Sequence, residues 1–112
     1  MTEVTNERVY SAVLSAVLSE ERVLRAAAEL LACARGQTAT LLVTHVVKRA
    51  ASLANKRMLL PPTYLSLARF HLLKHPVLTD SANRTWVLAE EVVRGRGRNK
   101  YYRLRYVRLK EG

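Results

Sequence analysis

The chain has 112 residues, 49% of them hydrophobic, and a formal net charge of +10 at pH 7. This length suits one domain with a modest core, and the single cysteine, Cys33, excludes an internal disulfide. No apolar run approaches the ~20 residues of a membrane helix, and the polar start MTEVTNERVY is unlike a signal peptide, so we expect a cytoplasmic protein without a membrane partner.

The first third of the chain has the apolar spacing of helices. Residues 5–18 place Val and Ala on one face, and Ser19-Glu20-Glu21 is a new start signal that favours a second helix ending near Arg35-Gly36. One bent helix over 5–35 is the alternative. Cys33 falls in the apolar stretch ELLACARG, so we expect a buried, inert thiol.

Two further helices are expected before the character of the sequence changes. Thr38 or Thr40 is the expected cap of a helix that continues to about Asn55. Pro61 and Pro62 then break the pattern and suit the first turn of a last helix, over residues 63–74, which His75 and Pro76 end.

The C-terminal third is expected to form a β-hairpin. Asp80 to Asn83 is a turn cluster, and Thr85 to Leu88 is β-branched and aromatic, which favours a strand. From Tyr101 to Leu109 the residues alternate, with tyrosine and leucine on one face and arginine on the other. We expect Glu90 to Lys100 to be a long basic loop between the two strands, and Trp86 to anchor the core beneath them.

Most of the surplus positive charge lies in the last twenty residues. Val93 to Gly112 carries eight Lys or Arg against one acid, a net +7, and the other ninety-two residues carry only +3. A localised basic field beside tyrosines attracts polyanions, of which nucleic acid is the commonest. Glu90 and Glu91 are expected to offset arginines at the base of this hairpin.

The order of three helices followed by a basic hairpin resembles the small winged helix-turn-helix DNA-binding proteins that are common in archaea and their viruses. The resemblance covers roughly residues 20–109 and rests on TYLSLARFHLLKHPVL, similar to a recognition helix running into a short strand, and on TWVL…YYRLRYV as the wing. It implies an α+β fold with a winged helix-turn-helix domain over residues 20–112. Residues 1–19 would be an N-terminal helix outside the minimal fold, acting in homodimerisation through 5–18 or packing on its own domain.

The same resemblance implies a nucleic-acid interface and a function. The third helix would face the major groove and the wing would contact the DNA backbone, in a transcriptional regulator or a chromatin-type, nucleoid-associated protein that binds double-stranded DNA. Arg69 is the preferred candidate for a base contact. The implied nucleic-acid-binding residues are Lys56, Arg57, Thr63, Tyr64, Ser66, Arg69, Lys74, Arg94, Arg96, Arg98, Lys100, Arg103 and Arg105.

Two other functions stay open at this point. The basic loop followed by tyrosines would also suit structured RNA, as in a ribosome-associated protein. In a protein-protein adaptor, the hydrophobic third helix would meet a partner and the charge would be incidental.

Catalysis and metal binding find little support in the sequence. We expect no enzyme, because phosphate-binding glycine loops, paired carboxylates in an apolar setting and a Ser-His-Asp elbow are all missing. His71 and His75 are four residues apart, but only Cys33 and His45 could join them as ligands, so we expect no metal and no cofactor.

Overall fold

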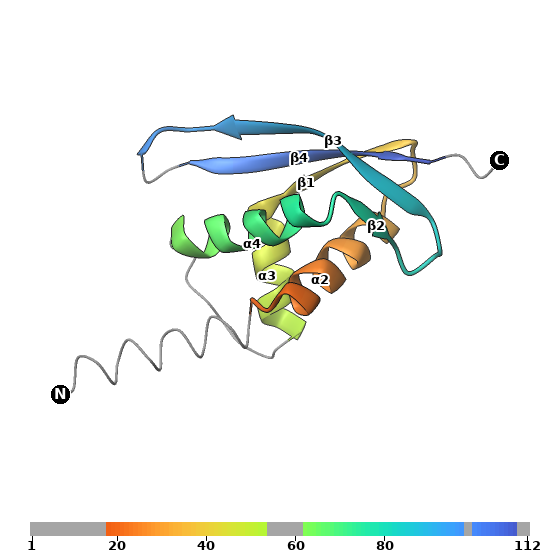
Figure 1. The fold of residues 1–112 in the computed structure, drawn as a ribbon, viewed down its shortest axis with the longest axis horizontal. Coiled ribbons are helices and arrows are strands. Elements are labelled where there is room, and N and C mark those ends of the chain that lie inside the picture. The colour runs from red at the N-terminus through yellow and green to blue at the C-terminus, as the bar shows by residue number, and fades with distance from the viewer. Residues whose placement is uncertain (1–17, 54–61, 98–99, 110–112) are drawn as a thin grey trace.

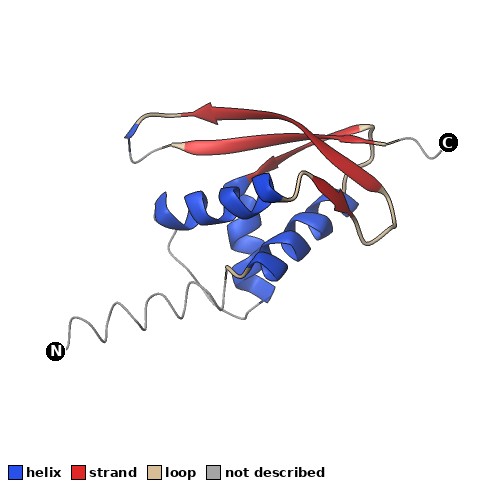
Figure 2. Ribbon diagram, in the orientation of Figure 1, coloured by secondary structure: helices blue, strands red, loops and turns tan. Residues whose placement is uncertain are grey.

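The computed structural model describes residues 18–53, 62–97 and 100–109, and within them the chain is a mixed α+β fold. The elements are α2 (Glu20–Ala32), β1 (Thr38–Leu42), α3 (Val43–Leu53), α4 (Pro62–Lys74), β2 (Val77–Thr79), β3 (Thr85–Arg94) and β4 (Tyr101–Arg108). The three helices lie together on one side of a four-stranded antiparallel sheet (Figure 1, Figure 2). The expected helix over 5–18 and its dimerisation face lie outside the described residues.

α2 and α4 begin where the sequence signals them, but α2 ends at Ala32, before the expected end near Arg35-Gly36. Ser19 caps α2 by accepting a hydrogen bond from the Arg22 amide at 3.2 Å, and two glutamates occupy its first turn, where the helix dipole favours acids. α4 begins at Pro62, whose missing amide hydrogen costs nothing in a first turn. Two separate features thus confirm the predicted starts of the second and last helices.

The expected cap at Thr38 or Thr40 is wrong, because Thr38–Leu42 is strand β1 and the following helix starts only at Val43. β1 pairs with β4 from Thr38 opposite Val107 to Leu42 opposite Arg103. The ladder hydrogen bonds and the packing of Leu41 beside Leu104 outweigh the local helical spacing.

The sheet has the strand order β1-β4-β3-β2, so the β3–β4 hairpin forms its centre. β3 is longer than expected, since it continues through Glu90 to Arg94 and leaves a shorter connection to β4. Its register shifts between Leu88 and Glu90, which leaves Ala89 as an extra residue, a β-bulge. Cross-strand pairs along Val92 and Val93 supply the β-branched residues that extend the strand.

The core fills the space between the helices and one face of the sheet. α2 contributes Val23, Ala26, Ala27 and Leu31, and α3 contributes residues at the same three- and four-residue spacing. Trp86 is fully buried, as predicted, and Tyr106 and Leu104 lie beside it on the same sheet face. The opposite face of the sheet has no helix over it in the described part of the chain (Figure 2).

A buried polar cluster fixes the turn between β2 and β3 against the end of α2. The Asp80 carboxylate accepts hydrogen bonds from the Trp86 indole at 2.9 Å and from the Arg84 guanidinium at 2.8 Å. Arg84 in turn donates to the carbonyls of Leu31, Ala32 and Ala34 at 2.8 to 3.3 Å, satisfying groups that a helix end leaves unpaired. The start of the hairpin is therefore fastened to the helical body.

Candidate nucleic-acid interface

The far end of the hairpin projects beyond the rest of the sheet. β1 reaches along β4 only as far as Arg103, and β2 pairs with β3 only over Thr85 to Val87. Beyond these limits β3 and β4 pair with each other alone, and Figure 1 shows the resulting two-stranded ribbon extending past the helices. A projecting ribbon can reach a groove or a backbone that the helical body does not touch.

The end of this ribbon carries exposed cations on a turn that needs glycine. Gly95 and Gly97 have φ values of +84° and +57°, a region that L side chains rarely adopt. Arg94, Arg96 and Lys100 are exposed around them, and we call these three residues the tip cations. Among the residues that the structure describes, no acid forms an ion pair with them, so their charge faces solvent.

Side chains of the ribbon divide between two faces. Tyr102, Leu104 and Tyr106 turn toward the helices, whereas Arg103 and Arg105 are exposed on the other side, as the alternation predicts. Residues paired across antiparallel strands share a face, so the register adds Arg94, opposite Tyr101, to the side of the exposed arginines. We call Arg94, Tyr101, Arg103 and Arg105 the outer face.

Acids compensate only part of this charge: Glu90 offsets a hairpin arginine as expected, but Glu91 does not. Glu90 accepts a hydrogen bond from Arg105 at 3.1 Å on the outer face. Arg103 lies 5.6 Å from the centroid of the Tyr101 ring, a cation–π contact that orders its guanidinium without neutralising it. Glu91 points to the inner face, where it forms an ion pair with an arginine from outside the hairpin.

That arginine is Arg69 of α4, the preferred base-contacting residue. Its guanidinium lies 2.7 Å from the Glu91 carboxylate and 5.1 Å from the centroid of the Tyr102 ring, so it is directed at the hairpin and not at open solvent. The sequence indicated no such link, because the two partners are 22 residues apart and no local pattern joins them. Arg69 therefore holds the hairpin against the helix.

α4 presents a narrow exposed stripe. From Tyr64 to Lys74 its exposed side chains are those of Ser66, Phe70 and Lys74, spaced four residues apart, and Phe70 is 54% exposed. Tyr64 is buried among core residues, so the expectation that it faces a ligand is wrong: its side chain serves the packing of α4 on the body. The sequence pattern places Phe70 among the apolar residues of this helix and does not indicate that it is exposed.

The end of α4 is anchored to the start of α2. Lys74 Nζ lies 4.0 Å from a Glu20 carboxylate oxygen and 5.4 Å from the centroid of the Phe70 ring. The same carboxylate hydrogen-bonds His75, and this bond lowers the pKa of Glu20. Lys74 is thus an exposed cation with an acid nearby, unlike the tip cations.

The implied nucleic-acid residues do not form one continuous surface. Ser66 and Lys74 lie on α4, Arg103 and Arg105 lie on the outer face of the sheet, and the tip cations lie at the end between these two sides. Lys56, Arg57 and Arg98 lie outside the described residues, as does the side chain of Thr63.

The described residues include no group of three His, Cys, Asp or Glu that could hold a metal ion. Cys33 is exposed, so the expected burial of its thiol is wrong: it follows the last residue of α2, where Sγ contacts only the Glu29 carbonyl at 3.6 Å. Within the described ranges, no helix is both long enough and apolar enough to cross a membrane.

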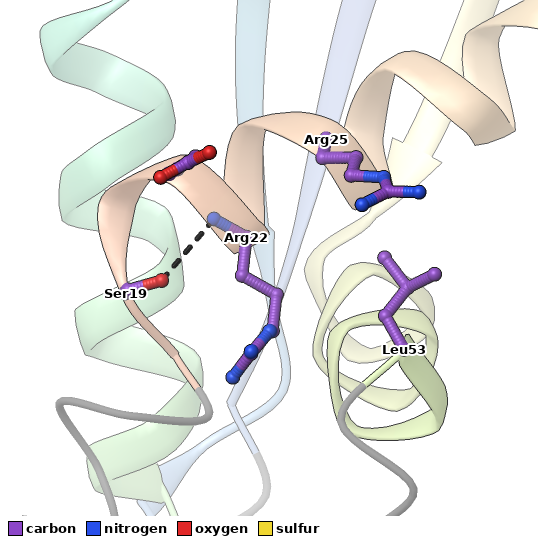
Figure 3. A pocket seen from close by; sticks show the side chains of 5 residues that line it. Ser19, Arg22, Arg25 and Leu53 are labelled. Carbon is purple, nitrogen blue, oxygen red and sulfur yellow. Dashed lines mark hydrogen bonds between the residues drawn. The ribbon is translucent and has the colours of Figure 1, made fainter.

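A pocket of about 170 Å³ lies at the start of α2 (Figure 3). Ser19, Glu21, Arg22, Arg25 and Leu53 line it.

Comparisons with protein-family models, with curated proteins and with solved structures found no match.

Proposed function

We propose that this protein binds double-stranded DNA as a winged helix-turn-helix protein, with α4 as the recognition helix and the β3–β4 hairpin as a basic wing. The exposed, acid-free tip cations on a projecting ribbon are the observation that carries the proposal. Arginine on a glycine-containing turn can follow a phosphate chain, because the backbone approaches closely and guanidinium binds phosphate through two hydrogen bonds.

The arrangement of wing and helix supports this proposal. The N-terminal half of α4 lies at the same end of the molecule as the hairpin tip (Figure 1). The link between Arg69 and Glu91 fixes the ribbon beside the helix, so a duplex against Ser66 would also meet the tip cations. Helix and wing would then share one DNA segment, the helix in a groove and the wing on the backbone.

A triple variant tests the proposal directly. Replacing Arg94, Arg96 and Lys100 by alanine should weaken binding to a short duplex by more than about tenfold at about 0.15 M salt, and should make the slope of log K against log salt shallower by about 2 to 3. The matched control replaces three exposed cations away from the hairpin, Arg25, Arg35 and Lys48. Equal losses in the two variants would show that only net charge matters and would end the proposal.

Competition with RNA separates this function from its main alternative. At about 0.2 M salt, duplex DNA should outcompete a structured RNA of equal length if the wing serves DNA. A preference for RNA of more than about tenfold would transfer the function to RNA binding.

Comparing the affinity for a selected duplex sequence with the affinity for a random one then distinguishes DNA packaging from transcriptional regulation. Equal affinities favour packaging, and a gap of several orders of magnitude favours regulation. If the variant without the tip cations still binds its main partner, and that partner is an apolar protein surface, the protein is an adaptor.

A further inference from the structure

The outer face carries cations that the proposed recognition surface does not use. Arg103 and Arg105 are exposed on the side of the sheet opposite the helices, and the register places Arg94 beside them. α4 lies on the other side of the same sheet (Figure 1). A duplex that rests on α4 and the tip therefore leaves Arg103 and Arg105 free.

The chemistry of this outer face fits a phosphate backbone. Apart from Arg94, which is also a tip cation, two arginines face one acid, Glu90, which leaves a net charge of +1 on this part of the face. The exposed Thr40 of β1, whose register partner is Arg105, adds a hydroxyl that can donate to phosphate oxygens. Tyr101 orders the Arg103 guanidinium from the side and leaves its N–H donors available.

A second copy of the chain is a poor occupant for this surface. Face-to-face packing would bring the arginines of the two copies together with only Glu90 of each copy to offset them. Valines 77, 87 and 107 form an apolar row on the same side of the sheet, but the arginines next to that row favour a partner of opposite charge. A polyanion meets that requirement along the stretch from Arg105 to Arg94.

The DNA segment that rests on α4 does not also reach Arg103 and Arg105, because β1 pairs with β4 at these residues and widens the sheet beyond the two-stranded ribbon that a major groove admits. A duplex has a persistence length of about 150 base pairs, so it does not fold back around a hairpin within one short site. We infer that the outer face binds a second duplex and that one molecule holds two DNA segments together. This inference rests on the proposed function and extends it to a bridging activity.

A two-duplex recovery assay tests the inference. A biotinylated duplex on beads is incubated with the full chain and a fluorescent duplex, and the recovered fluorescence reports bridging. The variant Arg103→Gln/Arg105→Gln should lower this recovery by more than about fivefold and change the affinity for a single short duplex by less than about threefold. Its matched control, Arg35→Gln/Lys48→Gln, removes two exposed charges away from the hairpin and should bridge like the wild type.

The outcomes separate the inference from the function on which it rests. Unchanged recovery in the outer-face variant overturns the inference, and sedimentation then shows whether a dimer bridges instead. A loss of single-duplex affinity as large as that of the tip variant also overturns it, because the outer face would then be the primary site. If the wild type binds one duplex but recovers no second, only the bridging fails. If it binds no duplex, the proposed function itself fails.

Discussion

The guanidinium of Arg69 on α4 lies 2.7 Å from the carboxylate of Glu91 on β3, and this ion pair joins the helix to the β3–β4 hairpin. The Arg69 side chain is 36% exposed and Glu91 is 19% exposed, so solvent screens the pair only in part. The contact makes Arg69 a positioning residue. It also keeps one cation of the helix from meeting phosphate.

Removing the acid should release that cation. We expect Glu91→Gln to bind a short duplex about two- to fivefold more tightly at about 0.1 M salt, with a salt slope steeper by about 1. The free energy of unfolding should fall by no more than about 1 kcal/mol, because partly exposed ion pairs contribute little. Glu21→Gln, an exposed acid of α2, is the control for net charge. An identical gain in both variants would mean that the pair does not restrain Arg69.

Acid should destabilise the fold through Asp80. Burial opposes ionisation of this carboxyl, but hydrogen bonds from Trp86, Arg84 and Ala82 outweigh burial and lower its pKa from 3.8 to about 2. A depressed pKa in the folded state contributes stability above about pH 4, and that contribution disappears as the pH falls toward 2. By linkage it amounts to about 2 kcal/mol.

Urea unfolding between pH 2 and pH 6 measures this contribution. The variant Asp80→Asn should be less stable than the wild type near neutral pH, and its stability should fall less steeply in acid. Parallel pH profiles for the two proteins would show that other carboxyls control the acid transition.

The end of α2 should depend on an arginine from outside the helix. α2 has no basic residue in its last turn, and Arg84 instead donates to two of its terminal carbonyls, those of Leu31 and Ala32, and to the Ala34 carbonyl just beyond its end. Arg84→Met keeps much of the aliphatic stem but loses every donor and leaves Asp80 without its cation, so we expect a loss of about 2 to 4 kcal/mol. Arg35→Met, an exposed change nearby, should cost less than about 0.5 kcal/mol by chemical denaturation.

Tyr106 offers a substitution that should not destabilise the protein. Its hydroxyl is buried without a hydrogen-bond partner among the described residues, and burial raises its pKa. Tyr106→Phe removes the unpaired group and preserves the packing, so the free energy of unfolding should stay equal or rise by up to about 1 kcal/mol. A loss above about 1 kcal/mol would reveal a partner for the hydroxyl. Tyr102→Phe, a change on the same sheet face, serves as the comparison.

The sequence predicted those elements whose signals are local. Ser19 and Pro62 mark helix starts, and the alternation after Tyr101 marks a strand with an exposed basic side. β1 escaped prediction because its partner, β4, follows some sixty residues later and the short segment TATLL continues the apolar spacing of the next helix. When a strand forms because it pairs with a strand far along the chain, its own residues carry only a weak sequence signal.

The same limit applies to the candidate site. Charge counting located the basic hairpin correctly, because charge density is a property of composition. It did not show that Arg103 and Arg105 lie on the face of the sheet opposite α4, because only the three-dimensional arrangement shows which face the helices cover. The partner of Arg69 depended on a tertiary contact for the same reason.

Ala89, the extra residue in β3, affects the direction of the hairpin but not the charge that the hairpin carries. A bulge bends its strand and increases the local twist, so this one unpaired position influences the direction in which the distal ribbon points. The cations that the ribbon carries lie elsewhere, at Arg94 and beyond. Deletion of Ala89 should therefore change the direction of the distal ribbon without removing any of its arginines, which gives evolution, or an engineer, a geometric control independent of electrostatic strength.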